Sequence, residues 1–239
     1  MRFNKAIDSI SVLSFDLDDT LYNNHPVIKA AVQAQLDYLS QITQWSQQGP
    51  HYWSHCRNQT VKQTPSLAND VTRWRKVALQ YGMSKLPLTK EQAHHYASCA
   101  YQAFSDARSN ITVQQSVLDL LGALRTKFRL IAITNGNVEI DKFNLRNEFE
   151  LVLKAGPDGA AKPHSELFDK AAVVLNVKKS EILHIGDSLD SDVQGANLAG
   201  CYSLWLNNQQ FKYKYLGLPH IEIHNINDLY QLVNTSPSK

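Results

Sequence analysis

The chain has few cysteines: its 239 residues include three, Cys56, Cys99 and Cys201. Their number is odd and the sequence has no C-x-x-C motif, so the spacing favours neither a disulfide framework nor a paired-cysteine metal or redox site. We expect free, buried thiols in a protein of a reducing compartment, the cytoplasm.

Long apolar runs and a strong net charge are also missing. No uncharged apolar run reaches the roughly 20 residues that a membrane span needs, and Asp8 interrupts the short apolar stretch near the N-terminus, which argues against a signal peptide. A net charge of +2 is too small to favour nucleic acid or an anionic membrane as a partner. We therefore expect neither of these as a partner, while the oligomeric state stays open.

The sequence does contain an acidic tract at the end of an apolar run. Residues 10–15 form a short apolar run with β-branched and aromatic side chains. Asp16, Asp18 and Asp19 follow this run directly. This pattern is typical of a buried strand that ends at a ligand site, because open α/β sheets bind ligands at the carboxyl ends of their strands. Three carboxylates in four residues repel each other, and a cation such as Mg²⁺ relieves that repulsion. Alone, the tract is equally typical of an acidic turn or a helix N-cap.

Further polar segments follow apolar runs or begin a helical one. They are Thr134-Asn135-Gly136 after a predicted strand at 128–134, Lys162-Pro163, and Gly186-Asp187 with Asp190 and Asp192 after a predicted strand at 181–185. Each alone is usually a turn, a solvated lysine or a cap. Their order along one chain favours a common site.

With these segments in this order, the chain resembles the phosphatases of the haloacid dehalogenase superfamily over nearly its whole length. Residues 16–20 match the first motif of that family, Thr134 the second, Lys162 the third, and Asp187 with Asp192 the fourth. Within the family it is similar to bacterial phosphatases of flavin mononucleotide, a likeness that also includes residues 70–75 and 155–157.

The resemblance implies a catalytic role for each core residue. Asp16 is expected to be the nucleophile that forms an aspartyl-phosphate, and Asp18 the general acid and then base. The Thr134 hydroxyl, with the backbone N–H groups of Asn135 and Leu17, is expected to hold the phosphoryl oxygens. Lys162 is expected to pair with both Asp16 and the phosphate.

The resemblance also implies Mg²⁺ as the cofactor. Its expected ligands are Asp16, the backbone carbonyl of Asp18, and Asp187, while Asp192 holds a metal-bound water or positions Lys162. Asp190 competes for the role of Asp192, which is preferred because it lies five positions after Asp187, as in the family motif.

Strand and helix patterns alternate from about residue 113 onward, which predicts a Rossmann-like, doubly wound parallel α/β sheet. The segment 23–110 is helical instead, with a polar stretch at 47–66 that contains helix breakers. We expect a catalytic core formed by 1–22 and 111–239, and a helical cap formed by 23–110. The polar loop at 207–220 has no assigned role.

Substrate specificity is expected to come from the cap, where Arg73-Trp74-Arg75 is the most informative motif. Trp74 can stack on a flat ring, and Arg73 can grip an anionic or carbonyl group. Alternatively, the ring packs in the cap and the arginines are solvated. The resemblance implies flavin mononucleotide and the phosphorylated ribitylamino-pyrimidine of riboflavin synthesis as substrates.

The first alternative is a phosphatase of the same family that acts on another sugar or nucleotide phosphate. Three other functions are also compatible with such a scaffold: a dehalogenase, a sugar-phosphate mutase and a non-catalytic phosphate-binding protein. A dehalogenase needs neither Mg²⁺ nor an acid for the leaving group, so Asp18, Asp187 and Asp192 argue against it. A non-catalytic protein is disfavoured because every catalytic position is filled. Only product analysis separates a mutase from a phosphatase.

Overall fold

A computed structural model describes residues 1–208 and 218–234 of the chain. Much of the loop predicted at 207–220 therefore lies outside the described residues. Contacts divide the chain into two units, which are described separately: one of residues 1–23, 112–136 and 143–239, the other of residues 24–111 and 137–142. The short segment 137–142, predicted as part of the core, groups with the helical unit.

The first unit is built on a seven-stranded sheet with the order β1-β7-β6-β5-β2-β3-β4. Its strands are β1 (Arg2–Phe3), β2 (Val12–Phe15), β3 (Arg129–Thr134), β4 (Leu151–Lys154), β5 (Ile182–Gly186), β6 (Tyr202–Leu206) and β7 (Ile221–Ile223). All pairings are parallel except that of β1 with β7. The predicted doubly wound sheet is confirmed, with the antiparallel edge strand β1 as an addition. Two residues are too few to show a strand periodicity, so the sequence could not reveal β1.

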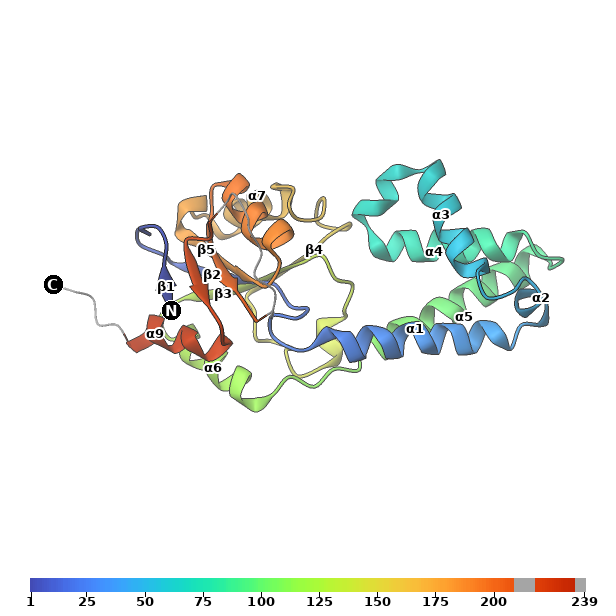
Figure 1. The fold of residues 1–239 in the computed structure, drawn as a ribbon, viewed down its shortest axis with the longest axis horizontal. Helices are drawn as coiled ribbons and strands as arrows, with labels where there is room; N and C mark the ends of the chain where they lie inside the picture. The colour runs from blue at the N-terminus through green and yellow to red at the C-terminus, as the bar shows by residue number, and fades with distance from the viewer. Residues whose placement is uncertain (209–217, 235–239) are drawn as a thin grey trace. The chain divides into compact units, whose positions relative to one another are not determined.

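Helices cover both faces of this sheet (Figure 1). They are α6 (Gln115–Arg125), α7 (Glu166–Leu175), α8 (Gln194–Ala199) and α9 (Tyr230–Asn234). In Figure 1, α7 lies on one face of the sheet, and α6 with α9 lies on the other. Phe168 and Leu167 of α7 pack on Ile133 and Val12 of the strands in a shared buried core. Strands that are buried on both faces form nearly continuous apolar runs, and β2 is buried throughout with Ser14 as its one polar residue.

The second unit consists of helices α1 (Asn24–Ser40), α2 (Thr43–Ser46), α3 (Tyr52–Gln63), α4 (Val71–Ser84) and α5 (Lys90–Arg108), with the short turns η1 (Pro65–Asn69) and η2 (Ile140–Lys142). Asp70 caps α4 by accepting a hydrogen bond from the Arg73 backbone N–H at 2.8 Å. Thr89 and Gln92 form a capping box at the start of α5. These local signals fix where the two helices begin.

Two sequence expectations are wrong in this unit. The polar stretch at 47–66 contains a full helix, α3, whose buried residues are Cys56 and Thr60 only, so its apolar stripe was too narrow to recognise. Cys56 and Cys201 are buried thiols, but Cys99 is partly exposed. In the part of the chain that the structure describes, no helix has both the length and the apolar character required to cross a bilayer.

Candidate active site

The carboxyl ends of three neighbouring strands form the centre of the candidate site. Strand β2 lies between β5 and β3, and Phe15 is paired with Ile185 on one side and Ala132 on the other. Asp16 follows Phe15 directly, and Asp187 and Thr134 lie two positions beyond those partners. Parallel pairing thus places the three side chains at one edge of the sheet.

Lys162 links the carboxylates at this edge. Its ammonium group is fully buried and donates to Asp16 Oδ1 at 2.8 Å, to Asp192 Oδ1 at 2.7 Å and to the Ile133 carbonyl at 2.7 Å. An ammonium has three N–H donors, and these contacts use all of them. Burial opposes the charge, but Asp16 and Asp192 raise the pKa of Lys162 above its ordinary value, so the ammonium stays protonated.

Asn135 holds the backbone of Lys162 in place. Its amide nitrogen donates to the Lys162 carbonyl at 2.9 Å, and its amide oxygen accepts from the Lys162 N–H at 2.8 Å. The family resemblance predicts a role for the backbone N–H of Asn135 but not this side-chain contact. Nothing local in the sequence links two residues 27 positions apart.

His184 forms a hydrogen bond with Asp192. The imidazole is completely buried, and its Nδ1 lies 2.9 Å from Ser14 Oγ while its Nε2 lies 3.2 Å from Asp192 Oδ1. Since the Lys162 protons are already used, Nε2 must carry the proton that is donated to Asp192, and Nδ1 accepts from Ser14. Burial and the charge of Lys162 lower the pKa of His184 to about 4, so the ring is neutral. His184 lies inside strand β5, and its contact with Asp192 ties that strand to the site.

Gly186 allows Asp192 to approach the end of β5. A Cβ at position 186 would lie 2.2 Å from Asp192 Cγ and 2.3 Å from its Oδ2, well inside van der Waals contact. We expect Gly186→Ala to displace the Asp192 carboxylate, and with it Lys162, and to cost about 1–3 kcal/mol of stability. Activity should fall at least about tenfold with the secondary structure retained, as measured by steady-state kinetics and circular dichroism.

Gly122→Ala is the matched control, because a Cβ there meets nothing within 4 Å. Normal activity in Gly186→Ala would mean that the position of Asp192 does not matter for the site.

A cluster of carboxylates has the donor set of a cation site. Asp16, Asp187 and Asp192 each offer an oxygen atom, and these atoms lie within 4.8 Å of one another. Burial and the charges of Asp192 and Asp19 raise the pKa of Asp187 to about 6. Burial also raises the pKa of Asp16, although Lys162 opposes that rise. Oxygen ligands whose charges repel each other fit a hard divalent cation, which would relieve the repulsion.

Asp192 is the least available of the three carboxylates. Its Oδ1 accepts from Lys162 and His184, and its Oδ2 accepts from the Ser188 backbone N–H at 3.0 Å. Burial would raise the pKa of Asp192, but Lys162 and His184 outweigh that effect and hold the pKa below its ordinary value. This arrangement suits a residue that positions Lys162. Asp190, the competing residue, is exposed.

The chain turns sharply after Asp16. Asp19 has a φ of +59°, its N–H donates to the Tyr22 carbonyl at 2.9 Å, and the Tyr22 hydroxyl donates to Asp18 Oδ1 at 2.6 Å. The Tyr22 hydroxyl therefore fixes the orientation of the Asp18 carboxyl, by a contact that was not predicted from the sequence. On the neighbouring strand, Thr134 Oγ1 accepts from the Gly136 N–H at 2.9 Å, which leaves its own proton for another acceptor.

Arg73 and Trp74 lie in the first turn of α4, in the helical unit. Arg73 is exposed, whereas Trp74 is half-buried and donates from Nε1 to the Arg57 carbonyl at 3.0 Å. The Arg57 guanidinium lies 4.4 Å from the centre of the Trp74 ring. The Arg57 guanidinium thus already contacts the Trp74 ring. A role of Arg73 and Trp74 in substrate binding stays a prediction.

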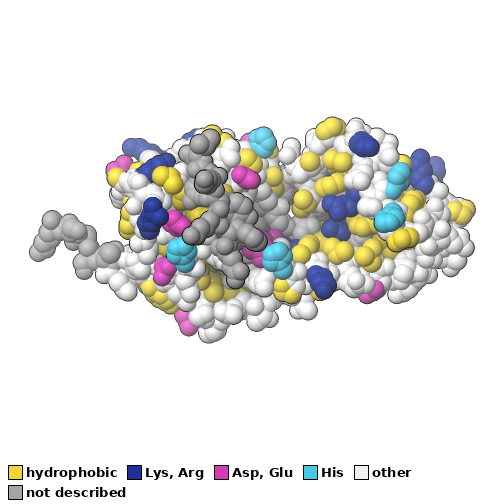
Figure 2. Space-filling model, viewed as in Figure 1, with side chains coloured by type: hydrophobic (Ala, Val, Ile, Leu, Met, Phe, Trp, Pro, Cys, Tyr) yellow, Lys and Arg dark blue, Asp and Glu magenta, His cyan; other side chains and the backbone are white. Residues whose placement is uncertain are grey.

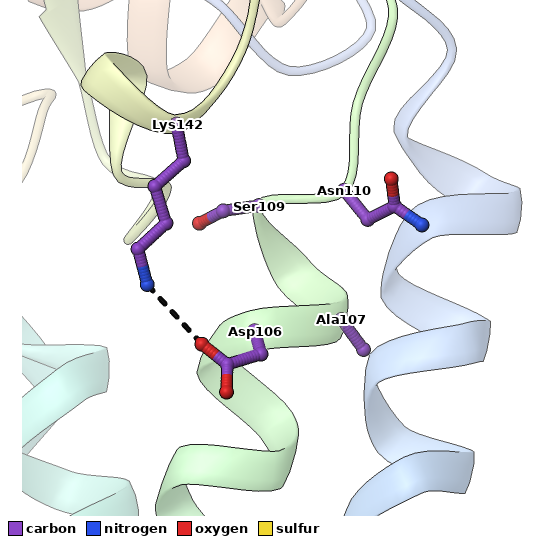
Figure 3. A pocket seen from close by; sticks show the side chains of 5 residues that line it. All are labelled: Asp106, Ala107, Ser109, Asn110 and Lys142. Carbon is purple, nitrogen blue, oxygen red and sulfur yellow. Dashed lines mark hydrogen bonds and ion pairs between the residues drawn. The ribbon is translucent and has the colours of Figure 1, made fainter.

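A separate depression in the helical unit carries no comparable chemistry. It is lined by Asp106, Ala107, Ser109, Asn110 and Lys142 (Figure 3). Its two charged groups point toward each other and form an ion pair at 3.2 Å.

Comparisons with known proteins agree on one family. The family model described as haloacid dehalogenase-like hydrolase matches residues 10–200. The chain is 37% identical to the 5-amino-6-(5-phospho-D-ribitylamino)uracil phosphatase YigB of Escherichia coli K12 over 238 residues, which are 98% of this chain and 100% of YigB. It is 30% identical to the pyrimidine 5'-nucleotidase YjjG of the same organism over 55% of this chain and 62% of YjjG.

A solved structure is similar over most of the chain. The structure described as a 2-haloacid dehalogenase from Pseudomonas syringae pv. tomato DC3000 superposes with a TM-score of 0.87 at 29% identity, covering 94% of this chain and 98% of the other. The likeness of fold therefore includes a protein named for dehalogenation as well as the phosphatases above.

Proposed function

The chain belongs to the haloacid dehalogenase-like hydrolases and is a phosphoric monoester hydrolase, and within this activity we propose that its substrates are phosphate esters of riboflavin synthesis. The candidates are 5-amino-6-(5-phospho-D-ribitylamino)uracil and flavin mononucleotide. The observation that carries the catalytic part of the proposal is the buried bridge from Lys162 to Asp16 and Asp192. The similarity to YigB over 98% of this chain supports the first of these two substrates.

In the proposed first step, Asp16 attacks the phosphorus atom and the bond to the alcohol oxygen breaks, which gives an aspartyl-phosphate. Lys162, held 2.8 Å from Asp16, offsets the repulsion between the carboxylate and the anionic ester. Asp18 donates its proton to the departing alkoxide, and Thr134 donates its hydroxyl proton to a phosphoryl oxygen. The backbone N–H groups of Leu17 and Asn135 also donate hydrogen bonds to the phosphoryl oxygen atoms.

In the proposed second step, Asp18 accepts a proton from water, and the water oxygen attacks the phosphorus atom of the aspartyl-phosphate. The bond to Asp16 breaks, so phosphate leaves and the carboxylate is regenerated. Mg²⁺ is the proposed cofactor, with Asp16, the Asp18 carbonyl and Asp187 as its ligands, and Asp192 as a residue that holds a metal-bound water or Lys162. When bound, it supplies positive charge next to the phosphoryl oxygens.

A panel of phosphate esters tests the proposed substrates. We expect kcat/KM to be at least about tenfold higher for the two riboflavin-related esters than for D-ribitol 5-phosphate, pyrimidine 5'-nucleotides and glyceraldehyde 3-phosphate. Equal rates across the panel, or a preference for the nucleotides, would contradict the substrate assignment. The similarity to a protein named as a dehalogenase adds one control, release of halide from a 2-haloacid, for which we expect no activity.

Removal of divalent cations should stop hydrolysis. With excess chelator we expect the rate to fall to background, and added Mg²⁺ to restore it, since the buried carboxylates Asp16 and Asp187 would otherwise repel the anionic ester. Ca²⁺ should restore less, because it takes more ligands and lets both oxygens of Asp16 bind the metal. Full activity in excess chelator would exclude Asp16 and Asp187 as metal ligands.

Asp18→Asn should impair poor leaving groups more than good ones. An alkyl phosphate requires protonation of its departing oxygen, whereas nitrophenolate leaves without it. We expect a loss of about a hundredfold or more in kcat/KM for the alkyl ester and a clearly smaller loss for 4-nitrophenyl phosphate. Equal losses would argue against an acid role in the first step, and burst kinetics would show whether the second step is slowed instead.

A further inference from the structure

His184 is a buried histidine to which the proposed mechanism gives no task. Figure 2 shows histidine side chains at the surface of the molecule. His184, by contrast, is 0% exposed and lies in the middle of β5. A buried imidazole has lost its hydration, so its ring nitrogens need partners within the protein. Both nitrogens of His184 have one, and one of these partners belongs to the candidate site.

The partner of Nδ1 is Ser14, on the neighbouring strand. Ser14 of β2 is paired with His184 in the parallel register of β2 and β5, and Ser14 Oγ lies 2.9 Å from Nδ1. Ser14 is also completely buried. In the neutral ring, a hydroxyl that donates to Nδ1 leaves the ring proton on Nε2. The pairing of the two strands thus favours Nε2 as the nitrogen that donates.

The partner of Nε2 is Asp192. Nε2 lies 3.2 Å from Asp192 Oδ1, the same oxygen atom that accepts from the Lys162 ammonium at 2.7 Å. A carboxylate oxygen has lone pairs for two donors, so His184 and Lys162 converge on one atom. Their nitrogen atoms are 3.3 Å apart, which is a contact between two donors. The position of Asp192 Oδ1 therefore depends on both of them.

Phe168 fixes the plane of the imidazole. The ring centres of Phe168 and His184 are 5.1 Å apart, and the planes of the two rings cross at 86°, an edge-to-face contact. Phe168 lies on α7 and is completely buried in the core between that helix and the sheet. With the ring plane held by Phe168 and Nδ1 held by Ser14, Nε2 stays directed at Asp192.

We propose that Ser14 and His184 are positioning residues for Lys162: through the Nε2–H donor they hold Asp192 in the place where it keeps the Lys162 ammonium 2.8 Å from Asp16. This inference rests on the proposed function and deepens it, because Lys162 offsets the charge repulsion in the first step. Without the Nε2–H donor the Asp192 carboxylate is free to turn, and Lys162 loses one of the two carboxylates that hold it. The attack of Asp16 on phosphorus then slows.

Two variants of His184, each made in the full chain, separate the donor from the shape of the ring. His184→Leu keeps the apolar bulk and removes the Nε2–H, whereas the amide of His184→Gln offers an N–H donor in place of Nε2. We expect His184→Leu to lower the single-turnover rate of Asp16 phosphorylation, and kcat, about ten- to a hundredfold, as is typical of a residue that orients a functional group. His184→Gln should come within about threefold of the wild type.

His220→Leu is the matched control. The ring of His220 lies 4.9 Å from that of Tyr202 at an angle of 81°, and its Nδ1 lies 3.2 Å from Ser203 Oγ, so its contacts with an aromatic ring and a serine resemble those of His184. Ser203 belongs to β6 and not to the candidate site. We expect His220→Leu to keep the kcat of the wild type. A loss as large as that of His184→Leu would overturn the inference, because any change of a histidine in this unit would then have the same effect.

Ser14→Ala tests the inference if His184→Leu does not fold, because it removes a single oxygen atom. Loss of one neutral hydrogen bond should lower kcat about three- to tenfold. Circular dichroism and thermal denaturation check the fold of each variant. A folded Ser14→Ala variant with the kcat of the wild type would overturn the role of the pair.

Nitrogen-15 NMR of the histidine-labelled wild type gives a readout that does not depend on activity. The spectrum of His184→Gln assigns the signals of His184 among the nine histidines of the chain. We expect a pyridine-type shift for Nδ1 and a pyrrole-type shift for Nε2. A pyrrole-type Nδ1 with an unprotonated Nε2 would overturn the inference, since Nε2 would then have no proton to donate to Asp192.

Lys162→Met separates this inference from the proposed function. If Lys162→Met is active, both the proposed mechanism and the role of His184 are wrong. If Lys162→Met is inactive and a folded His184→Leu variant keeps the kcat of the wild type, only the positioning role is wrong. A His184→Gln variant as impaired as His184→Leu would also overturn that role, because the shape of the ring and not its donor would then decide the rate.

Discussion

Asp16→Asn should abolish hydrolysis while the fold persists. The amide has the shape of the carboxylate but lacks the anionic oxygen that would attack phosphorus and bind a cation. Because loss of the nucleophile removes the covalent route altogether, we expect kcat to fall by at least about three orders of magnitude. Steady-state kinetics on any accepted ester measures this loss, and circular dichroism checks the fold.

Mass spectrometry of the quenched enzyme gives a direct readout of the same step. A phosphoryl group should be found on Asp16 in the wild type and be absent from the variant. Asp119→Asn, an exposed acid on α6, serves as the matched control and should behave as the wild type. Retention of more than about one per cent of the rate in Asp16→Asn would contradict covalent catalysis by this residue.

Lys162→Met should impair both activity and stability. The ammonium is the cation that pairs with two buried carboxylates, so its removal leaves Asp16 and Asp192 as neighbouring, uncompensated charges. Breaking a buried pair in this way costs about 3–5 kcal/mol, and the attack of a carboxylate on an anionic ester also loses its neutralising charge. We expect a much lower midpoint of denaturation and a kcat at least about a thousandfold below that of the wild type.

The double variant Lys162→Met, Asp192→Asn separates the two effects. It removes one of the two uncompensated charges, so part of the lost stability should return, whereas the activity should not. A single Lys162→Met variant as stable as the wild type would mean that the bridge contributes nothing to folding. An active one would remove Lys162 from the proposed mechanism.

Those features of the fold that depend on short stretches of sequence could be predicted. The apolar runs before Asp16 and Asp187 are strands of a parallel sheet, and the order of strands and helices from residue 113 gives the doubly wound core. Gly200 ends α8 with a φ of +82°, the left-handed conformation in which glycine commonly follows a helix. Each of these signals lies within about ten residues, the range over which periodicity and capping act.

The contacts that shape the site could not be predicted, because they join distant segments. Ser14 and His184 are 170 positions apart. Each lies within an apolar strand pattern, which predicts a core position but not the contact between the two residues. The same holds for the hydrogen bond from Arg75 to Gln35, since these residues are 40 positions apart on two helices. Helix α3 was missed for a different reason: its sequence is polar, and tertiary packing of a few residues decides its conformation.

The hydrogen bonds of Asn135 also bear on the chemical ageing of the protein. An asparagine followed by glycine is the dipeptide most open to deamidation, in which the glycine nitrogen attacks the side-chain amide carbon. In the folded chain both partners of that reaction are restrained: the Asn135 amide is held by two hydrogen bonds to Lys162, and the Gly136 N–H is bound to Thr134 Oγ1. We expect the contacts that position Lys162 to slow the loss of the amide group as well.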